Sequence, residues 1–167
     1  MANTKYVYMT GKASYARLRE DNRDMGENLP DGDQKRNIEA VQGKYVMNLF
    51  VDRETKLQGI KDGLPKTGMS GQLWKEDDEG NIFYKCTRQH FNPKFVNEEK
   101  GQDGILGAPK VVIKTENGLE PYTGNIGNDS IVTVKLSVWN ESKVELQAVR
   151  IDELVEWETV DNDEDYF

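Results

Sequence analysis

Aromatic and basic side chains share one face of the stretch SIVTVKLSVW, from Ser130 to Trp139. Three valines and Leu136 occupy every second position, so an extended strand would bury them and direct Lys135 and Trp139 outward. An outward tryptophan can stack on an unpaired nucleic-acid base, and this stacking contributes roughly 1–3 kcal/mol per base. A nearby cation can contact the phosphates at the same time. The alternative is that such rings complete the core or a dimer interface.

Two further stretches combine rings and cations in the same way. Asn81–Phe91 alternates between an apolar face and a face that carries Phe83 and Lys85, and Lys5–Leu18 contains several tyrosines close to basic residues. Both patterns predict strands with one polar side. The strand phases give these candidate nucleic-acid-binding residues: Tyr8, Lys12, Tyr15, Arg17, Phe83, Lys85, Arg88, Lys135 and Trp139.

Residues that commonly carry catalysis or bind transition metals are scarce in this sequence. His90 is the only histidine and Cys86 the only cysteine, which leaves no soft-ligand set for zinc. Cys86 shares the phase of Ile82 and Tyr84 and is interpreted as a small buried hydrophobe. A single cysteine excludes an internal disulfide and fits a reducing compartment. No catalytic residue, metal site or cofactor is predicted, and the chain is not expected to be an enzyme.

Negative charge is concentrated in residues 152–167. The chain has 30 acidic and 22 basic residues, and this segment holds eight of the acids and no base. A block of like charges is typical of an interaction tail, and a solvating disordered segment is the alternative. We predict a folded domain over residues 1–158 and an acidic tail over 159–167. The predicted partner-binding residues of the tail are Asp161, Asp163, Glu164, Asp165, Tyr166 and Phe167.

Strands must position these candidate residues, because the sequence contains six alternating stretches and only one plausible helix. The helix is predicted over Asp52–Leu64 with Asp52 as its cap. Polar loops are predicted at 19–43, 65–71 and 92–109, the first long enough to suggest a function. No run of about eighteen apolar residues is present, so no membrane span is predicted. The predicted strands are Lys5–Leu18 (broken near Gly11), Lys44–Val51, Asn81–Phe91 with QLWKE as a candidate partner, Lys110–Thr115, Ser130–Trp139 and Lys143–Trp157.

The predicted fold is all-β with one short helix, an OB-fold of five to six antiparallel strands in a barrel with long loops. The order of elements resembles that of the single-stranded DNA-binding proteins of short-tailed bacteriophages. The resemblance is carried by GKYVMNLFV followed by a helix, then GNIFYKCTRQHF, then VVIKTENGLEPYTGNIGNDSIVTVKLSVWNESKVELQAVRIDELVEW and the acidic ending. It covers most of residues 44–167. Two features depart from the family pattern: the tail is short, and the basic content of the strand 130–139 is reduced to Lys135.

The resemblance implies an OB-fold that binds and protects single-stranded DNA, without strong sequence preference, during phage DNA replication and recombination. It implies DNA contacts at Trp139, Lys135 and Lys85, and it adds Lys114 to the candidates. It also implies that the tail recruits a phage DNA polymerase and a primase-helicase. Such proteins often form a homodimer and act in the cytoplasm of the infected bacterial host.

Other classes of protein remain as alternatives. The main one is an OB-like protein-interaction module or an acidic DNA mimic that inhibits a host enzyme, and a small virion component is another. A DNA mimic would spread acidic residues over one face, whereas here the excess is confined to residues 152–167. A basic groove that binds DNA can also bind the tail. The tail is therefore expected to compete with DNA and to become available to partners when DNA displaces it.

Overall fold

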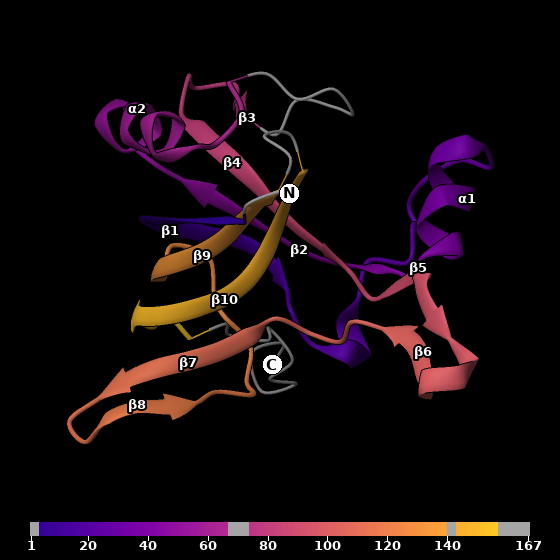
Figure 1. Cartoon of the computed structure of the whole chain (residues 1–167). Coiled ribbons are helices and arrows are strands. Elements are labelled where there is room, and N and C mark those ends of the chain that lie inside the picture. The colour runs from indigo at the N-terminus through magenta and orange to yellow at the C-terminus, as the bar shows by residue number, and fades with distance from the viewer. Residues whose placement is uncertain (1–3, 67–73, 140–142, 157–167) are drawn as a thin grey trace, which may run out of the picture.

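The computed structural model describes residues 4–66, 74–139 and 143–156, and this part of the chain is mostly β-structure (Figure 1). Eight strands form one sheet in the order β3-β4-β2-β1-β9-β10-β7-β8, and β5 and β6 form a separate hairpin. The strands are β1 (Lys5–Arg17), β2 (Lys44–Phe50), β3 (Trp74–Glu76), β4 (Ile82–Gln89), β5 (Phe91–Asn97), β6 (Gln102–Ile105), β7 (Lys110–Thr115), β8 (Gly118–Pro121), β9 (Ile131–Trp139) and β10 (Lys143–Glu153). The helices are α1 (Asp33–Ala40) and α2 (Arg53–Asp62), with 3-10 helices η1 (Glu20–Asn22) and η2 (Glu98–Lys100).

The sheet buries one face because apolar residues occupy alternate positions along its central strands. The three alternating valines and Leu136 of β9 are buried, as the sequence predicted. Tyr84 and Cys86 of β4 are fully buried in the same core, and burial raises the pKa of the Cys86 thiol to about 12. Alternation along β9 and β4 therefore assigned these inward side chains correctly.

Strand β1 curls the sheet because it changes its partner along its length. Residues 5–12 lie antiparallel to β9, and the stretch from Lys12 to Arg17 lies antiparallel to β2. The strand continues through Gly11 without the predicted break. Glycine is required there because a Cβ would overlap the backbone oxygen of Phe50. The shared strand turns β2 and β9 around a common core.

The predicted barrel is confirmed as a mostly β fold and is wrong in several details. The sheet has eight strands, β7 lies parallel to β10, and two α-helices are present in the described residues. The five central strands follow the order β4-β2-β1-β9-β10, and the outer two of them, β4 and β10, contact each other. No hydrogen-bonded ladder joins β4 to β10 in the described part of the chain, so the barrel is not closed.

The predicted helix is confirmed as α2, and its start and end have local causes. The Asp52 carboxylate accepts a hydrogen bond from the backbone N–H of Thr55 at 2.7 Å, which caps the first turn. Gly59 is buried against Met9, and a Cβ at this position would lie 2.9 Å from the Met9 sulfur. The glycine that weakens this helix therefore allows it to approach β1 closely.

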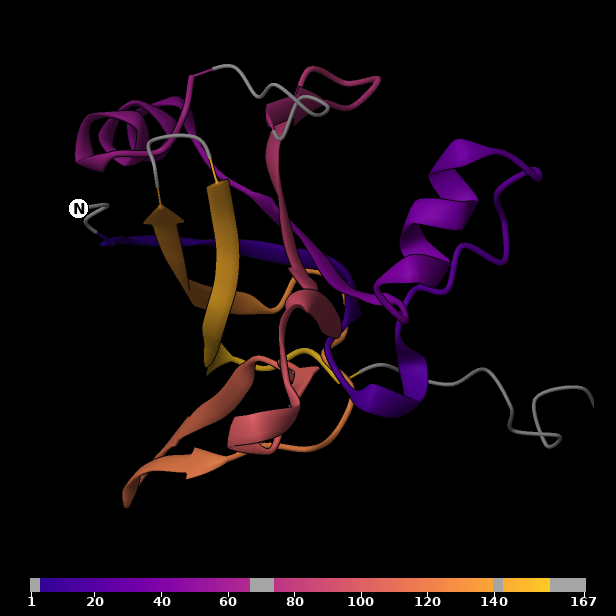
Figure 2. The ribbon, with the colours of Figure 1, turned by 45° about the vertical axis from the view of Figure 1, so that its right-hand side comes forward.

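Two segments predicted as loops contain regular structure. Residues 19–43 include η1 and α1, and residues 92–109 include most of β5, with η2 and β6. Figures 1 and 2 show α1 and α2 on opposite sides of the molecule, while the β7–β8 hairpin projects away from both. The described part of the chain contains no helix that is long and apolar enough to cross a membrane.

Candidate nucleic-acid interface

Four of the five central strands, β4, β2, β1 and β9, contain no Asp or Glu, although the chain has 30 acidic residues. We call their outward side, opposite the core, the outer face. Aromatic rings, cations and small polar groups occupy most of its positions. A surface of this kind attracts a polyanion even when the whole protein is negatively charged. The basic residues of the four strands are Lys5, Lys12, Arg17, Lys44, Lys85, Arg88 and Lys135.

The first feature of the outer face is a line of four side chains across four strands, which we call the phenylalanine row. Lys75 of β3 lies opposite Phe83 of β4, Phe83 lies opposite Phe50 of β2, and Phe50 lies opposite Lys12 of β1. The two rings are half-buried, with centroids 5.0 Å apart and planes tilted by 44°. Three strand spacings separate the two lysines, about 14 Å. The row thus places an apolar platform between two cations.

Lys85 lies one row further along β4, opposite Asn48 of β2. Burial lowers the pKa of Lys85, and the positive charges of Lys75 and Lys44 lower it further, whereas Asp24 raises it. Lys75 and Lys44 thus add positive charge around Lys85. A bound phosphate would offset the repulsion among these charges, because an anion near a lysine favours its protonated form.

The second feature is the tyrosine cluster, formed by Tyr6 and Tyr8 of β1, Lys135 and Trp139 of β9, and Lys143 of β10. Tyr8 lies opposite Lys135, whose ammonium group is 4.5 Å from the centroid of the Tyr6 ring. The ammonium group of Lys143 lies 4.8 Å from the Trp139 ring. Tyr6, Tyr8 and Trp139 are 53%, 58% and 42% exposed. These rings present free surface, and cations are already placed against two of them.

Two threonine hydroxyls and one carboxylate whose charge is paired lie between the phenylalanine row and the tyrosine cluster. Thr10 of β1 hydrogen-bonds Thr133 of β9 at 2.8 Å, and the Thr133 hydroxyl is 2.7 Å from the Asp152 carboxylate. Burial alone would raise the pKa of Asp152, but hydrogen bonds from Arg150 and Thr133 lower it overall. The negative charge of Asp152 is thus held by Arg150 and does not cancel the cations of the outer face.

The structure brings six of the ten predicted DNA-binding residues to these two features: Lys12 and Phe83 in the phenylalanine row, Lys85 next to it, and Tyr8, Lys135 and Trp139 in the tyrosine cluster. Trp139 is exposed at the end of β9, so its ring is accessible as the hypothesis requires. The six predicted tail residues lie outside the described part of the chain.

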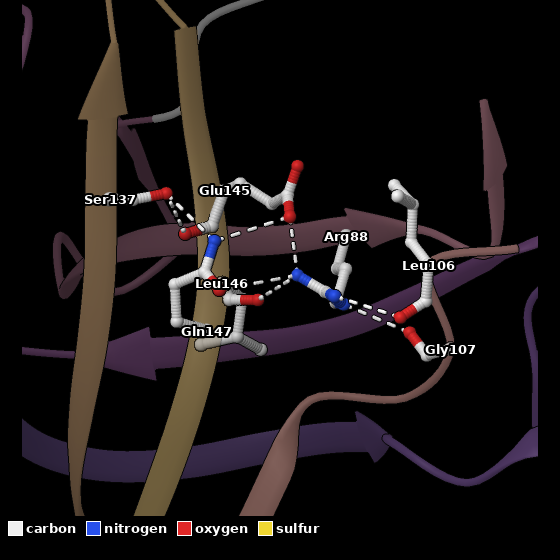
Figure 3. A network of polar contacts seen from close by, with 7 residues as sticks. All are labelled: Arg88, Leu106, Gly107, Ser137, Glu145, Leu146 and Gln147. Carbon is white, nitrogen blue, oxygen red and sulfur yellow. Dashed lines mark hydrogen bonds and ion pairs between the residues drawn. The ribbon is translucent and has the colours of Figure 1, made fainter. Parts of the chain in front are cut away.

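Arg88 is engaged by the protein itself (Figure 3). Its side chain is 12% exposed and follows the inward phase of Tyr84 and Cys86. The guanidinium forms an ion pair with Glu145 of β10 and donates to the backbone oxygens of Leu106 at 3.0 Å and Gly107 at 2.9 Å. These contacts join β4 to β10 and to the segment before β7. They leave the guanidinium few free donors for DNA.

The other three predicted residues lie apart from both features. Arg17 forms an ion pair with Glu27 at 2.8 Å and a longer one with Asp24 at 3.6 Å. Lys114 is exposed on the β7–β8 hairpin, opposite Leu119. Tyr15 is 73% exposed at an irregular point of β1.

Sequence reasoning missed four members of the two features: Tyr6, Phe50, Lys75 and Lys143. Tyr6 shares the strand phase of Tyr8 and could have been found from that phase. Phe50 and Lys75 become candidates only when their partners across the strands are known. Lys143 joins Trp139 through the β9–β10 pairing, and the intervening turn at 140–142 lies outside the described residues.

The described residues contain no group of three or more His, Cys, Asp or Glu side chains that could hold a metal ion. Lysine and aromatic side chains are prominent on the outer face, and these groups bind anions and flat rings.

Comparison with known proteins gives a match in structure and none in sequence. No protein-family model and no curated protein matches the chain. The structure is similar to the crystal structure of gp2.5, a single-stranded DNA binding protein encoded by bacteriophage T7. The similarity has a TM-score of 0.60 and 16% sequence identity, and it covers 98% of this chain and 94% of the other. The resemblance inferred from the sequence is therefore confirmed at the level of the fold: this chain has the fold of a phage single-stranded DNA binding protein.

Proposed function

We propose that this protein binds single-stranded DNA through its outer face, without strong sequence preference, and protects it during phage DNA replication and recombination. The observation that carries the proposal is the absence of acidic residues from β4, β2, β1 and β9, combined with the exposed rings on the same strands. The shared fold with the T7 protein supports it. An enzymatic role has no comparable support.

The geometry favours single strands over duplexes. Base stacking on a protein ring requires the flat face of the base to be free, and a duplex covers that face on both sides. The phenylalanine row and the tyrosine cluster contain five rings, and stacking on a ring uses the flat face of a base rather than its edge. Such a surface tolerates any base sequence, while Lys12, Lys75 and Lys135 neutralise the phosphates.

Binding should therefore depend on salt in proportion to the lysines that contact phosphate. A gel shift with oligo(dT) and with a duplex of equal length, at two salt concentrations, is expected to show preference for the single strand and weaker binding at high salt. Replacing Lys12 or Lys85 by glutamine is expected to reduce the slope of log affinity against log salt by about 0.7 each. Lys94→Gln, on the exposed β5 strand, is the matched control and should leave the slope unchanged. Equal binding of duplex and single strand would contradict the proposal.

We also propose that the acidic tail at 159–167 recruits the phage DNA polymerase and primase-helicase and competes with DNA for the outer face. The support is the charge distribution: the tail is acidic, whereas β4, β2, β1 and β9 carry basic residues and no acidic ones. Deleting residues 159–167 is expected to tighten oligo(dT) binding at low salt and to abolish stimulation of a cognate polymerase. A filter-binding titration and a primer-extension assay measure the two effects. Weaker binding after the deletion would contradict competition.

A protein-interaction module is the second candidate, because one described surface favours it. Phe95 and Val96 of β5 and Ile105 of β6 are 55%, 44% and 42% exposed on the same hairpin. The homodimer implied by the resemblance stays a prediction, and sedimentation of the full chain measures it. A protein that binds neither single-stranded nor duplex DNA, yet self-associates through this hairpin, would favour the second candidate.

A further inference from the structure

Tyr15 occupies an irregular point of β1 where the strand departs from its alternation. The pairing of β1 with β2 shifts between Ser14 and Arg17, which marks a β-bulge. Ala13 is buried and Ala16 packs against the core, so two consecutive residues between them, Ser14 and Tyr15, lie on the outward side. Regular alternation would have placed Tyr15 in the phase of Ala13. The bulge thus redirects a large ring from the core side to solvent.

The backbone at Tyr15 adopts the left-handed conformation, with a φ of 53°. Glycine or asparagine usually occupies such a position, because a bulky side chain is strained there. The ring is 73% exposed, and no hydrogen bond or ring contact of its side chain is present among the described residues. Packing therefore does not explain a tyrosine at this position. Strained residues that the surrounding structure holds in place are concentrated at functional sites.

The segment before β9 holds the bulge. The Asn128 side-chain oxygen accepts a hydrogen bond from the backbone N–H of Tyr15 at 3.1 Å. Next to this contact, two backbone hydrogen bonds join Ala13 to the same segment, from Asp129 N–H to the Ala13 oxygen at 2.9 Å and from Ala13 N–H to the Ser130 oxygen at 2.8 Å. Asp129 is itself left-handed, with a φ of 72°. Asn128 thus ties the backbone of Tyr15 to the segment before β9.

We propose that Tyr15 is a further base-stacking ring of the outer face, and that Asn128 is its positioning residue. The inference rests on the proposed function and adds a site to it. Next to the phenylalanine row, a second line of side chains crosses three strands. It runs from Lys85 of β4 through Asn48 of β2 to Ser14 of β1, which is adjacent to Tyr15. A strand of DNA that crosses Phe50 and Phe83 would find its next ring at Tyr15 and its next cation at Lys85.

Two substitutions at Tyr15 separate the role of the ring from the strain. Tyr15→Ala and Tyr15→Gly both remove the ring and are expected to weaken oligo(dT) binding by the same factor, between ~5-fold and ~150-fold. Tyr15→Gly is expected to melt about 2–4 °C above Tyr15→Ala, because glycine adopts a positive φ without strain. At an ordinary strand position the order of melting temperatures would be reversed. Tyr15→Phe is the control that keeps the ring and should bind as wild type does.

A double-mutant cycle tests the role of Asn128. Asn128→Ala is expected to weaken oligo(dT) binding in the wild-type background and to have no effect on binding in the Tyr15→Ala background. An equal loss in both backgrounds would show that Asn128 acts on DNA or on the fold without Tyr15. Circular dichroism and melting temperature confirm that each variant is folded.

The result for wild type distinguishes the two proposals. If the wild-type protein does not bind oligo(dT), the proposed function fails. If it does bind, and Tyr15→Ala binds within twofold of wild type, only the inference on Tyr15 is overturned.

Discussion

Replacing Phe50 and Phe83 together by leucine is expected to weaken binding of single-stranded DNA by at least about 30-fold. Each ring is expected to stack on one base, and a lost base–aromatic stack costs about 1–3 kcal/mol. Leucine keeps most of the apolar volume, so the free energy of unfolding should fall by only about 1 kcal/mol per site. The rings are half-buried and 5.0 Å apart between centroids, so the pair acts as one platform. Fluorescence anisotropy with labelled oligo(dT) at fixed salt measures the loss.

Matched variants on the same two strands test whether the effect belongs to the rings. Val46 of β2 lies opposite Thr87 of β4, on the same outward side as Phe50 and Phe83. Val46→Ala with Thr87→Ala should leave affinity within about twofold of wild type. Tyrosine in place of either phenylalanine keeps a flat ring and should keep affinity. If the double leucine variant binds as well as wild type, the phenylalanine row is not the stacking site.

The faces of the strands could be predicted from the sequence because burial follows alternation. Each buried apolar residue of β9 and β4 sits two positions from the next, so one core residue identifies the outward residues between them. Trp139 and Lys135 were found in this way. Arg88 continues the inward phase of Tyr84 and Cys86, so alternation predicts an inward side chain there as well.

The pairing of strands could not be read from alternation alone. Phe50 becomes a stacking candidate only because Phe83 and Lys12 lie opposite it, and those contacts join residues far apart in the chain. Sequence alternation describes one strand at a time, and register depends on which strands meet. The eight-stranded mixed sheet was missed for the same reason: β7 reaches β10 in parallel only after β8 and β9 intervene.

Helix α1 was missed because it buries little. Of its eight residues only Ile38 is buried, so the segment lacks the apolar stripe from which a helix is predicted. The β5–β6 hairpin was missed for a similar reason. Two consecutive apolar residues of β5, Phe95 and Val96, are both exposed. The strand therefore lacks the alternation of apolar and polar residues from which a half-buried strand is predicted.

Replacing Arg88 by alanine is expected to lower the free energy of unfolding by about 2–4 kcal/mol. The substitution removes an ion pair with Glu145 and leaves the backbone oxygens of Leu106 and Gly107 without a donor. Glu145 is 38% exposed, so solvent partly compensates its charge and the expected loss lies below that of a fully buried pair. Urea unfolding monitored by tryptophan fluorescence measures the change.

The consequence for function follows from where Arg88 lies. It joins β4 to β10 across the gap that no hydrogen-bonded ladder closes in the described strands, so its loss should loosen the barrel on that side. Affinity of the folded variant for oligo(dT), measured well below its melting temperature, should stay within about threefold of wild type. Arg36→Ala, which breaks an exposed ion pair with Asp33 on α1, is the matched control and should cost less than about 0.5 kcal/mol. An Arg88→Ala protein that keeps wild-type stability and loses affinity would contradict this structural role. It would show that Arg88 contacts DNA and that β4 and β10 pack against each other without it.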